Sequence, residues 1–577
     1  MSLIRETENY LLDVLSSLGY KLNNIKLEVS SRKELGEFQL NVAMPLAKLN
    51  HENPVEIAKK IISALDDRFI NVNIAGPGFI NLSFNHSYLL NNLNKGITDF
   101  NVFIDKESPK KIVIDYGGAN AAKALHVGHM RSANIGESIK RLSVLFVNEV
   151  ISDVHLGDIG RQSGMIITEL MIEQPNYEAF KEDFVFDINN FPKVNLNKED
   201  LKRMYPSASI KAKESDERMQ QVREVTALVD EGEPVFSEIW RQIVEISKID
   251  INASYKRLNC HFDLWEGEMD AIKYIPDVLN IMKPYLYKSE GATVMDVREE
   301  SDKIDIPPLF VLKSDGATKY ETRELGTLYS RITRFNPDEI WYVVDDRQSL
   351  HFTQVFRGAY KSKLVPVGTL LKHFGFGTIN GKDGKPFKTR DGGVMELSAL
   401  MDMVYEAIDK KIKPEITGDE RKEICEKLTI ATIKYTDLLP FRKTDYIFDL
   451  EKFSSLEGKT GPYIMYTLVR IKSILRKFNN IDYHMTKIVN ESEKDILIKI
   501  LGLSQVLSLS YREASLNYIC EYLYELCSLV NKFYGEINIT NEKNKENQQN
   551  YIAFINLIYN VIKNILNILA IDEIDKM

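Results

Sequence analysis

Cysteine is scarce in this chain, which has only four in 577 residues. No two of them form a Cys-x-x-Cys pair, and no histidine cluster completes a set of metal ligands. The cysteines are Cys260, Cys425, Cys520 and Cys527. This spacing argues against a structural zinc, and we expect no metal site built by the protein itself. Reduced thiols in a cytoplasmic protein are the simplest interpretation.

A long uninterrupted hydrophobic run is also missing. The amino terminus carries Arg5, Glu6 and Glu8 before its first apolar stretch, so it does not resemble a secretory signal. The most apolar late segment, FINLIYNVIKNILNILAI (554–571), is interrupted by asparagines and a lysine. That spacing predicts an amphipathic bundle helix and no membrane span. The polar, low-complexity stretch just before it, NEKNKENQQN (541–550), predicts a loop with no packing content.

An excess of positive charge is lacking too, since the net charge is −9 at pH 7. The surface as a whole is therefore not built to attract nucleic acid, and any RNA contact depends on local basic stretches. A hydrophobic content of 44% can fill several cores, so we expect three or four domains.

The domain boundaries fall near residues 105 and 400. Segment 1–105 predicts a small α+β domain, with short helices before a strand pair around the turn Gly76-Pro77-Gly78. Segment 106–400 predicts an α/β domain carrying a charged, mostly helical insertion at about 165–300. Segment 401–577 is nearly all helical in pattern.

What the chain does contain is the stretch IVIDYGGANAAKALHVGHMRSAN (112–134), a strand, a glycine-rich loop and the start of a helix. We expect the helix to run to about Leu145. His126 and His129 are three apart, so both project from one side of its first turn, over unpaired backbone N–H groups. Such a turn carries partial positive charge and suits a nucleotide phosphate. Gly128 removes a side chain that would clash with a flat ring.

This stretch resembles the first signature of class I aminoacyl-tRNA synthetases, and the run Asn120, Lys123, His126, Gly128, His129 resembles their arginine-specific branch. The resemblance implies a multidomain α/β protein. Its parts would be a Rossmann-like parallel-sheet catalytic domain with insertions, a small amino-terminal α+β domain and an all-α anticodon-binding bundle. It also implies that His126, Gly128 and His129 bind ATP, that the two histidines act in catalysis, and that Lys123 shares the phosphate work.

A second polar, glycine-rich segment is GKDGKPFKTRDGG (381–393). Its cations would close over the pyrophosphate and neutralise the charge that develops as the α-phosphorus is attacked. The alternative is a solvated hairpin turn. The segment resembles the second signature of the family, in a variant form. The resemblance implies catalytic roles for Lys385 and Lys388 and ATP contacts for Lys388, Thr389 and Arg390.

Arginine is a planar cation with five N–H donors, and carboxylates with hydrogen-bonding neighbours select it. Asp115 closes the strand before the histidine loop, Tyr320 and Glu324 share one face of an expected helix, and Gln348 follows the strand at 340–346. By resemblance, Asp115, Tyr320, Glu324 and Gln348 form the guanidinium shell and Asn120 holds the α-amino group. The family usually has Asp where this chain has Glu324. Alone, each acid could equally be a solvated surface charge.

A further strand-end loop, HLGDIGRQSG (155–164), is a possible substrate loop or a plain structural turn. Its candidate residues are Gly157, Asp158, Gly160 and Gln162.

In GPYIMYTLVRIKSILRKF (461–478), one apolar stripe faces a core, and the other face offers aromatic and cationic side chains to tRNA. A solvated bundle face is the alternative. The candidate tRNA contacts are Tyr463, Tyr466, Arg470 and Lys477.

Together these features predict ligation of arginine to its tRNA through an arginyl-adenylate, with ATP as substrate and Mg²⁺ arriving with it. We expect a monomer. Two alternatives stay open, a class I synthetase for another amino acid and a synthetase-derived RNA-binding protein without catalysis. The second would have lost the histidines or the 381–390 lysines, and this chain retains them.

Overall fold

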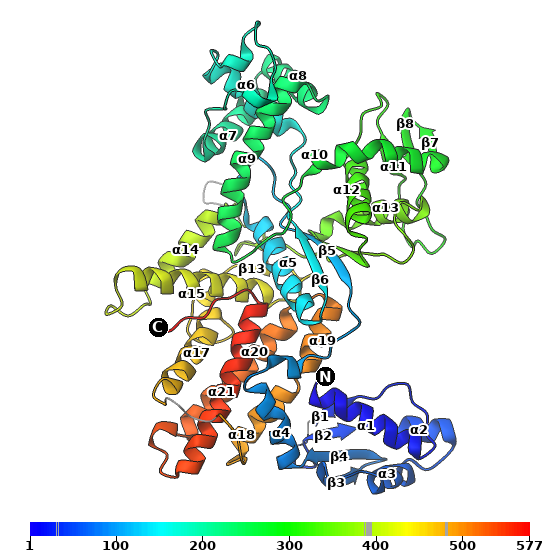
Figure 1. Ribbon diagram of the computed structural model, residues 1–577, viewed down its shortest axis with the longest axis vertical. Coiled ribbons are helices and arrows are strands. Elements are labelled where there is room, and N and C mark those ends of the chain that lie inside the picture. Colours follow the sequence, from blue (N-terminus) through cyan, green and yellow to red (C-terminus); the bar gives the residue numbers. More distant parts are fainter. Residues whose placement is uncertain (31, 33, 386, 388–394, 479–482) are drawn as a thin grey trace.

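The computed structural model describes residues 1–30, 32, 34–385, 387, 395–478 and 483–577. The catalytic sheet lies at the centre, the insertion and a second lobe rise on its upper side, and the helical bundle and amino-terminal domain lie below (Figure 1). This arrangement confirms the expected multidomain α/β fold.

The amino-terminal domain is an antiparallel sheet, ordered β1-β2-β4-β3, with helices packed beside it. Its strands are β1 (Leu27–Val29), β2 (Phe38–Leu40), β3 (Phe69–Ala75) and β4 (Phe79–Phe84). Its helices are α1 (Leu3–Ser17), α2 (Ala43–Asn50), α3 (Pro54–Ser63), α4 (His86–Gly96) and the 3-10 turn Phe100–Phe103. The predicted β3–β4 pair is present. The strands β1 and β2 were not expected, because three residues are too short to show an alternating pattern.

The catalytic core is a parallel sheet in the order β11-β10-β5-β6. Its strands are β5 (Lys111–Tyr116), β6 (Glu149–Asp153), β10 (Glu339–Val343) and β11 (Leu370–His373). The chain leaves β5 through α5 (Val127–Leu145) toward β6, whereas β10 lies on the other side of β5. A crevice forms where strand order reverses in this way, at the carboxyl ends of the strands.

The insertion is helical up to Met282 and then changes character. Its helices are α6 (Arg161–Glu173), α7 (Lys198–Glu214), α8 (Asp216–Asp230), α9 (Pro234–Arg257), α10 (Glu268–Ala271) and α11 (Ile275–Met282). The segment that follows forms an antiparallel sheet of β7 (Leu286–Ser289), β8 (Ala292–Met295) and β9 (Leu309–Leu312). The expected helical insertion therefore ends earlier than residue 300. The lobe is completed by α12 (Tyr320–Phe335) and α13 (Ser349–Lys361).

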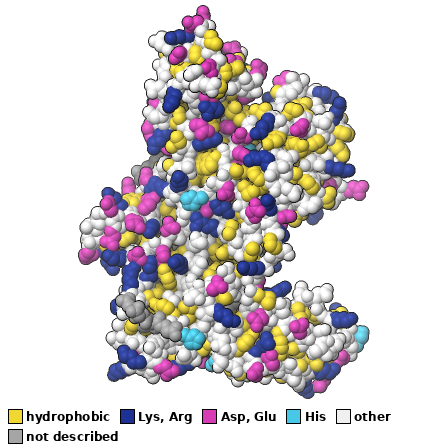
Figure 2. All heavy atoms as spheres, in the orientation of Figure 1, with side chains coloured by type: hydrophobic (Ala, Val, Ile, Leu, Met, Phe, Trp, Pro, Cys, Tyr) yellow, Lys and Arg dark blue, Asp and Glu magenta, His cyan; other side chains and the backbone are white. Residues whose placement is uncertain are grey.

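The carboxyl-terminal part is a bundle, as the helical pattern predicts. Its elements are α14 (Leu397–Asp409), α15 (Gly418–Leu438), α16 (Leu450–Phe453), α17 (Gly461–Leu475), α18 (Glu491–Leu501), α19 (Leu503–Glu513), α20 (Asn517–Glu536) and α21 (Lys545–Ile568). A small parallel bridge, β12 (Ile379–Asn380) with β13 (Tyr446–Ile447), links it to the catalytic domain. Acidic and basic side chains are mixed over the face seen in Figure 2.

The prediction of a loop at 541–550 is wrong from Lys545 onward, where α21 begins. Asn544 caps that helix, accepting from the N–H groups of Glu546 and Asn547. Asn550 is 1% exposed, and its side chain donates to Glu493 and accepts from the N–H groups of Thr486 and Lys487. Composition hid the start of this helix because its first turn is exposed and polar, and the two residues buried next, Gln548 and Asn550, are polar as well.

Among the described helices, α21 alone has the length and apolar composition to cross a membrane, and 67% of that window is buried inside the protein. It packs against α17, α5 and α4. Burial of this kind identifies a core helix of the bundle.

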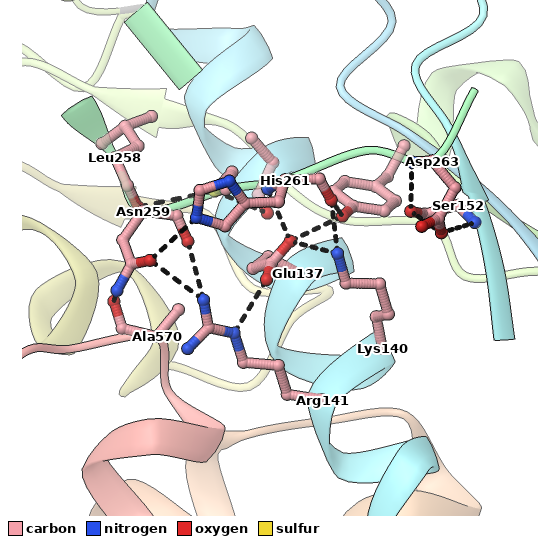
Figure 3. A network of polar contacts seen from close by, with 12 residues as sticks. Glu137, Lys140, Arg141, Ser152, Leu258, Asn259, His261, Asp263 and Ala570 are labelled. Carbon is pink, nitrogen blue, oxygen red and sulfur yellow. Dashed lines mark hydrogen bonds and ion pairs between the residues drawn. The ribbon is translucent and has the colours of Figure 1, made fainter. Parts of the chain in front are cut away.

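A polar joint fastens the catalytic helix α5 to the end of the bundle (Figure 3). Glu137 accepts from the Arg141 Nε at 2.7 Å and from the His261 N–H at 3.1 Å. Arg141 also donates to Asn259 and, at 3.1 Å, to Asn567 at the end of α21. Burial alone would raise the pKa of Glu137, but Lys140, Arg141 and the Tyr116 hydroxyl lower it to about 2. Glu137 is therefore ionised at neutral pH and can pair with the two cations of its own helix.

Candidate active site

A cavity of about 340 Å³ opens at the carboxyl ends of β5, β6 and β10. Its volume is in the range of small-ligand sites. The sequence-predicted residues that line it are Asp115, Asn120, His126, Gly128, His129, Gly157, Tyr320, Glu324 and Gln348. Segments more than 200 positions apart thus meet at one site.

The two histidines cap α5 reciprocally. His126 is the N-cap residue and its Nδ1 accepts from the Gly128 N–H at 3.1 Å. The His129 Nδ1 accepts from the His126 N–H at 3.0 Å. Because a backbone N–H can only donate, each neutral ring carries its proton on Nε2. Neither Nε2 has a protein partner among the described residues, so both are free to donate into the cavity.

Both rings are neutral at physiological pH. Burial, reinforced by Lys123, lowers the pKa of His126. Burial and the neighbouring His126 lower the pKa of His129 to about 3. The ring centroids are 3.8 Å apart, which favours the neutral forms further. The pair therefore acts through N–H dipoles rather than through charge.

Beneath the cavity, Arg331 of α12 joins two buried carboxylates. One of its terminal nitrogens donates to Asp115 at 2.7 Å and to Asp153 at 2.8 Å. Burial raises the pKa of Asp115 to about 6, although Arg331 and His155 oppose it. Burial disfavours a charged His155, but Asp153 at 3.4 Å raises the pKa of His155 to about 9. The negative charges of Asp115 and Asp153 are therefore largely balanced by Arg331 and His155 before any substrate binds.

Glu324 differs from these two acids, because no arginine, lysine or histidine among the described residues forms an ion pair with it. It is 4% exposed, lines the cavity, and its Oε1 has no hydrogen-bond partner within the part of the chain that the structure describes. A buried carboxylate oxygen without a donor is costly unless a ligand supplies one. Tyr320 lies one helical turn before it in α12, and Gln348, which follows β10, lines the same cavity.

Sequence reasoning missed a third acid in this wall. Glu268, at the start of α10, lines the cavity and receives a hydrogen bond from the Arg323 Nε at 2.5 Å. Burial raises the pKa of Glu268. It belongs to the segment predicted as a helical insertion, and no motif marked it.

The predicted substrate loop divides into two parts. Gly157 borders the cavity, whereas Asp158, Gly160 and Gln162 do not line it. The Gln162 amide donates to the carbonyl groups of Gly157 and Ile159, so it closes the turn itself.

The predicted lysines lie at the edge of the described structure. The Lys123 Nζ lies 4.9 Å from the centre of the Tyr205 ring, and neither Lys123 nor Lys385 lines the cavity. Lys388, Thr389 and Arg390 fall outside the described residues. The chain beyond them returns to the histidines, since the Val127 N–H donates to the Met395 carbonyl at 3.2 Å and Glu396 pairs with His126.

The candidate tRNA contacts on α17 are partly used within the bundle. Arg470 donates to Asn531 at 2.9 Å, and the Tyr463 hydroxyl accepts from the Asn531 amide at 3.1 Å. Tyr466 is 43% exposed and Lys477 is exposed. Neither side chain has a hydrogen bond or ion pair among the described residues, although Arg470 lies over the Tyr466 ring at 5.7 Å.

A parallel sheet whose carboxyl edge carries a His-x-Gly-His helix start and an acid-lined cavity defines a class I aminoacyl-tRNA synthetase. Three family models match: "tRNA synthetases class I (R), catalytic domain" at residues 97–450, "DALR anticodon binding domain" at 464–577, and "Arginyl tRNA synthetase N terminal domain" at 5–84. The chain belongs to the arginyl-tRNA synthetase family.

Similar proteins agree over nearly the full length. An arginine–tRNA ligase of Alkaliphilus oremlandii is 40% identical over 552 residues, which covers 94% of each chain. One of Agathobacter rectalis is 39% identical over 549 residues, covering 91% of this chain and 92% of the other. The crystal structure of the Plasmodium falciparum arginyl-tRNA synthetase has a TM-score of 0.80 at 23% identity, covering 100% of this chain and 99% of that one. The similarity to this crystal structure shows that the two chains share a fold.

Proposed function

We propose that the cavity binds arginine and ATP side by side and that the chain is an arginine–tRNA ligase. The arginine carboxylate attacks the α-phosphorus of ATP, and pyrophosphate leaves. A ribose hydroxyl at the end of the tRNA then attacks the carbonyl carbon, and AMP leaves. No protein nucleophile is needed, so the residues act by positioning and by stabilising charge.

The observation that carries the proposal is that two kinds of group line one cavity. Two neutral imidazole donors stand at a helix start, a favourable place for phosphate oxygens. The same cavity is lined by Glu268 and by Glu324, one of whose oxygens has no hydrogen-bond donor among the described residues. A guanidinium satisfies both carboxylates at once, with donors in a planar fork. Asp115, Tyr320 and Gln348 would complete its shell, and Asn120 would hold the α-amino group.

Mg²⁺ would enter on the phosphates of ATP. Among the described residues one group of side chains has metal-ligand spacing, Asp115, Asp153 and His155. The Arg331 terminal nitrogen already occupies the place between its two carboxylates, so this group does not fit a resident metal ion. Lys123, Lys385, Lys388, Thr389 and Arg390 are proposed to neutralise the departing pyrophosphate.

The remaining assignments concern the whole chain. The divisions at 105 and 400 are supported by the change from an antiparallel sheet to a parallel one, and then to helices. Tyr466 and Lys477, with Tyr463 and Arg470, are proposed to face tRNA. A monomer in the cytoplasm without a structural zinc stays a prediction.

The deciding experiment measures charging of arginine-specific tRNA by the purified protein, with arginine and with lysine as separate substrates. We expect charging with arginine only. Charging with another amino acid would favour the other-synthetase alternative, and binding of tRNA without charging would favour the non-catalytic one.

A further inference from the structure

The loop after β6 connects two cavity residues that are far apart in sequence. On one side, the Gly157 N–H donates to the Ala119 carbonyl at 2.9 Å, beside Asn120. On the other side, the Leu156 N–H donates to the Glu266 carbonyl at 2.7 Å, and the Glu268 N–H donates back to Leu156 at 3.1 Å. The loop therefore continues the parallel sheet on both flanks, up to Glu268.

Asp158 ends this run and clamps the peptide that follows Glu268. It is 5% exposed, and its Oδ1 accepts from the Met269 N–H at 3.0 Å. Its own carbonyl accepts from the Trp240 indole at 2.7 Å, which fixes the loop from the side of α9. Asp158 thus holds Met269 without reaching the cavity.

Gly267 permits this close approach. A Cβ built at Gly267 would lie 2.3 Å from the Asp158 Oδ2, a distance that real Cβ atoms essentially never show. The backbone of Gly267 is extended, with φ −138°, so any residue could adopt it. The requirement for glycine is therefore steric, and it concerns the Asp158 carboxylate.

Glu268 is consequently held at three points. The Leu156 carbonyl accepts from the Glu268 N–H, and the Asp158 carboxylate accepts from the N–H of the next residue, Met269. The Arg323 Nε donates to one oxygen of the Glu268 carboxylate. The other oxygen, Oε1, has no hydrogen-bond partner among the described residues. The direction in which that oxygen points is set by the two backbone anchors.

We propose that Asp158 is a positioning residue for arginine selection, which aims the Glu268 carboxylate at the guanidinium by clamping the Met269 N–H. The inference rests on the proposed function of the cavity. It assigns the loop 155–158 a role in specificity, although only Gly157 of its predicted residues borders the cavity.

The test compares steady-state charging by Asp158→Ala and Asp158→Asn. We expect Asp158→Ala to raise the KM for arginine about tenfold with a much smaller change in kcat, since a small misplacement of a binding group is costly. The KM for ATP should not change. Asp158→Asn keeps an oxygen that accepts from Met269, so its KM should stay within about threefold of the wild type. Gly267→Ala, which displaces the same carboxylate, should reproduce the Asp158→Ala effect and serves if that variant does not fold.

A double-mutant cycle separates this proposal from the function on which it rests. If Asp158 acts through Glu268, then Asp158→Ala should add less than about twofold to the arginine KM of Glu268→Gln. If the double variant instead raises the arginine KM by the product of the two single-variant factors, Asp158 does not act through Glu268. That result would overturn the positioning role and leave Glu268 in the pocket. An unchanged arginine KM in Glu268→Gln would remove Glu268 from the proposed function and overturn the positioning role with it. Equal loss in Asp158→Asn and Asp158→Ala would also contradict the clamp.

Discussion

At the residue scale, the histidines of α5 donate from Nε2 because Nδ1 of each is occupied by a backbone N–H. The same ring thus both caps the helix and serves the cavity. An asparagine has an acceptor oxygen at nearly the position of Nδ1 but nothing at the position of Nε2. This difference allows the two roles to be tested apart.

His129→Asn should keep the cap and remove the donor. We expect adenylate formation to slow by about 10² to 10³, the usual effect of losing one preorganised donor. Binding of tRNA and the melting temperature should change little. His129→Ala should lose about 1 kcal/mol of stability in addition, because it also removes the cap. Single-turnover adenylate formation and thermal unfolding measure the two effects, and a similar loss of tRNA binding would count against the assigned role.

The affinity for arginine should fall on acidification. Burial raises the pKa of Asp115 to about 6, against the opposing charges of Arg331 and His155 and with help from Asp153 and Glu324. Below that pH the carboxyl group is protonated and loses its attraction for a guanidinium, so the KM for arginine should rise as pH drops through 6. Asp115→Asn should have a high KM without this step. A wild-type KM that is flat from pH 5.5 to 8 would place Asp115 outside the pocket.

At the scale of elements, close packing of α5 against β5 depends on a missing side chain. A Cβ at Gly136 would lie 2.2 Å from the Tyr116 Cγ. Tyr116 cannot withdraw, since its hydroxyl donates to Glu137 at 2.7 Å. Gly136 therefore sets the distance between the catalytic helix and its strand.

Gly136→Ala should lower the free energy of unfolding by about 3 kcal/mol, because overpacking outweighs the gain in helix propensity. Gly535 in α20 provides the matched control, since a Cβ there meets nothing within 4 Å. Gly535→Ala should stabilise the protein by about 1 kcal/mol. Denaturant unfolding of both variants checks the pair, and two changes of the same sign would contradict this account.

The sequence could predict the elements of the cavity that have a local pattern of their own, but not those placed by distant contacts. The strand before the histidines, the helix carrying Tyr320 and Glu324, and the strand before Gln348 were each marked by a local pattern, so the cavity could be largely anticipated. Glu268 could not, because its place depends on pairing with a loop 112 positions earlier. The polar start of α21 was missed for a related reason, since Glu493 makes Asn550 a buried residue.

At the scale of the molecule, the amino-terminal domain is bound to the bundle through specific polar contacts. Asn94 of α4 accepts from the Met485 N–H at 2.8 Å and donates to the Met485 carbonyl at 2.9 Å. The Lys494 ammonium lies 2.5 Å from a carboxylate oxygen of Glu37. Domains joined in this way should present their surfaces to tRNA as one unit.

Asn94→Ala should leave both polar groups of the buried Met485 peptide unpaired, at a cost of about 1–3 kcal/mol. We expect faster hydrogen exchange at Met485 and its neighbours. The control is Asn92→Ala, because among the described residues the Asn92 side chain bonds only to Tyr88 of its own helix. Unchanged exchange in Asn94→Ala would mean that other contacts hold the two domains together.

The joint around Glu137 also bears on how the protein should be prepared. The Ala570 carbonyl accepts from the Asn259 amide at 3.2 Å, and Asn259 in turn accepts from Arg141 of the catalytic helix at 3.0 Å. Any change that displaces the segment around Ala570 would therefore loosen the hold on that helix, so the segment should be kept intact when the protein is altered for study.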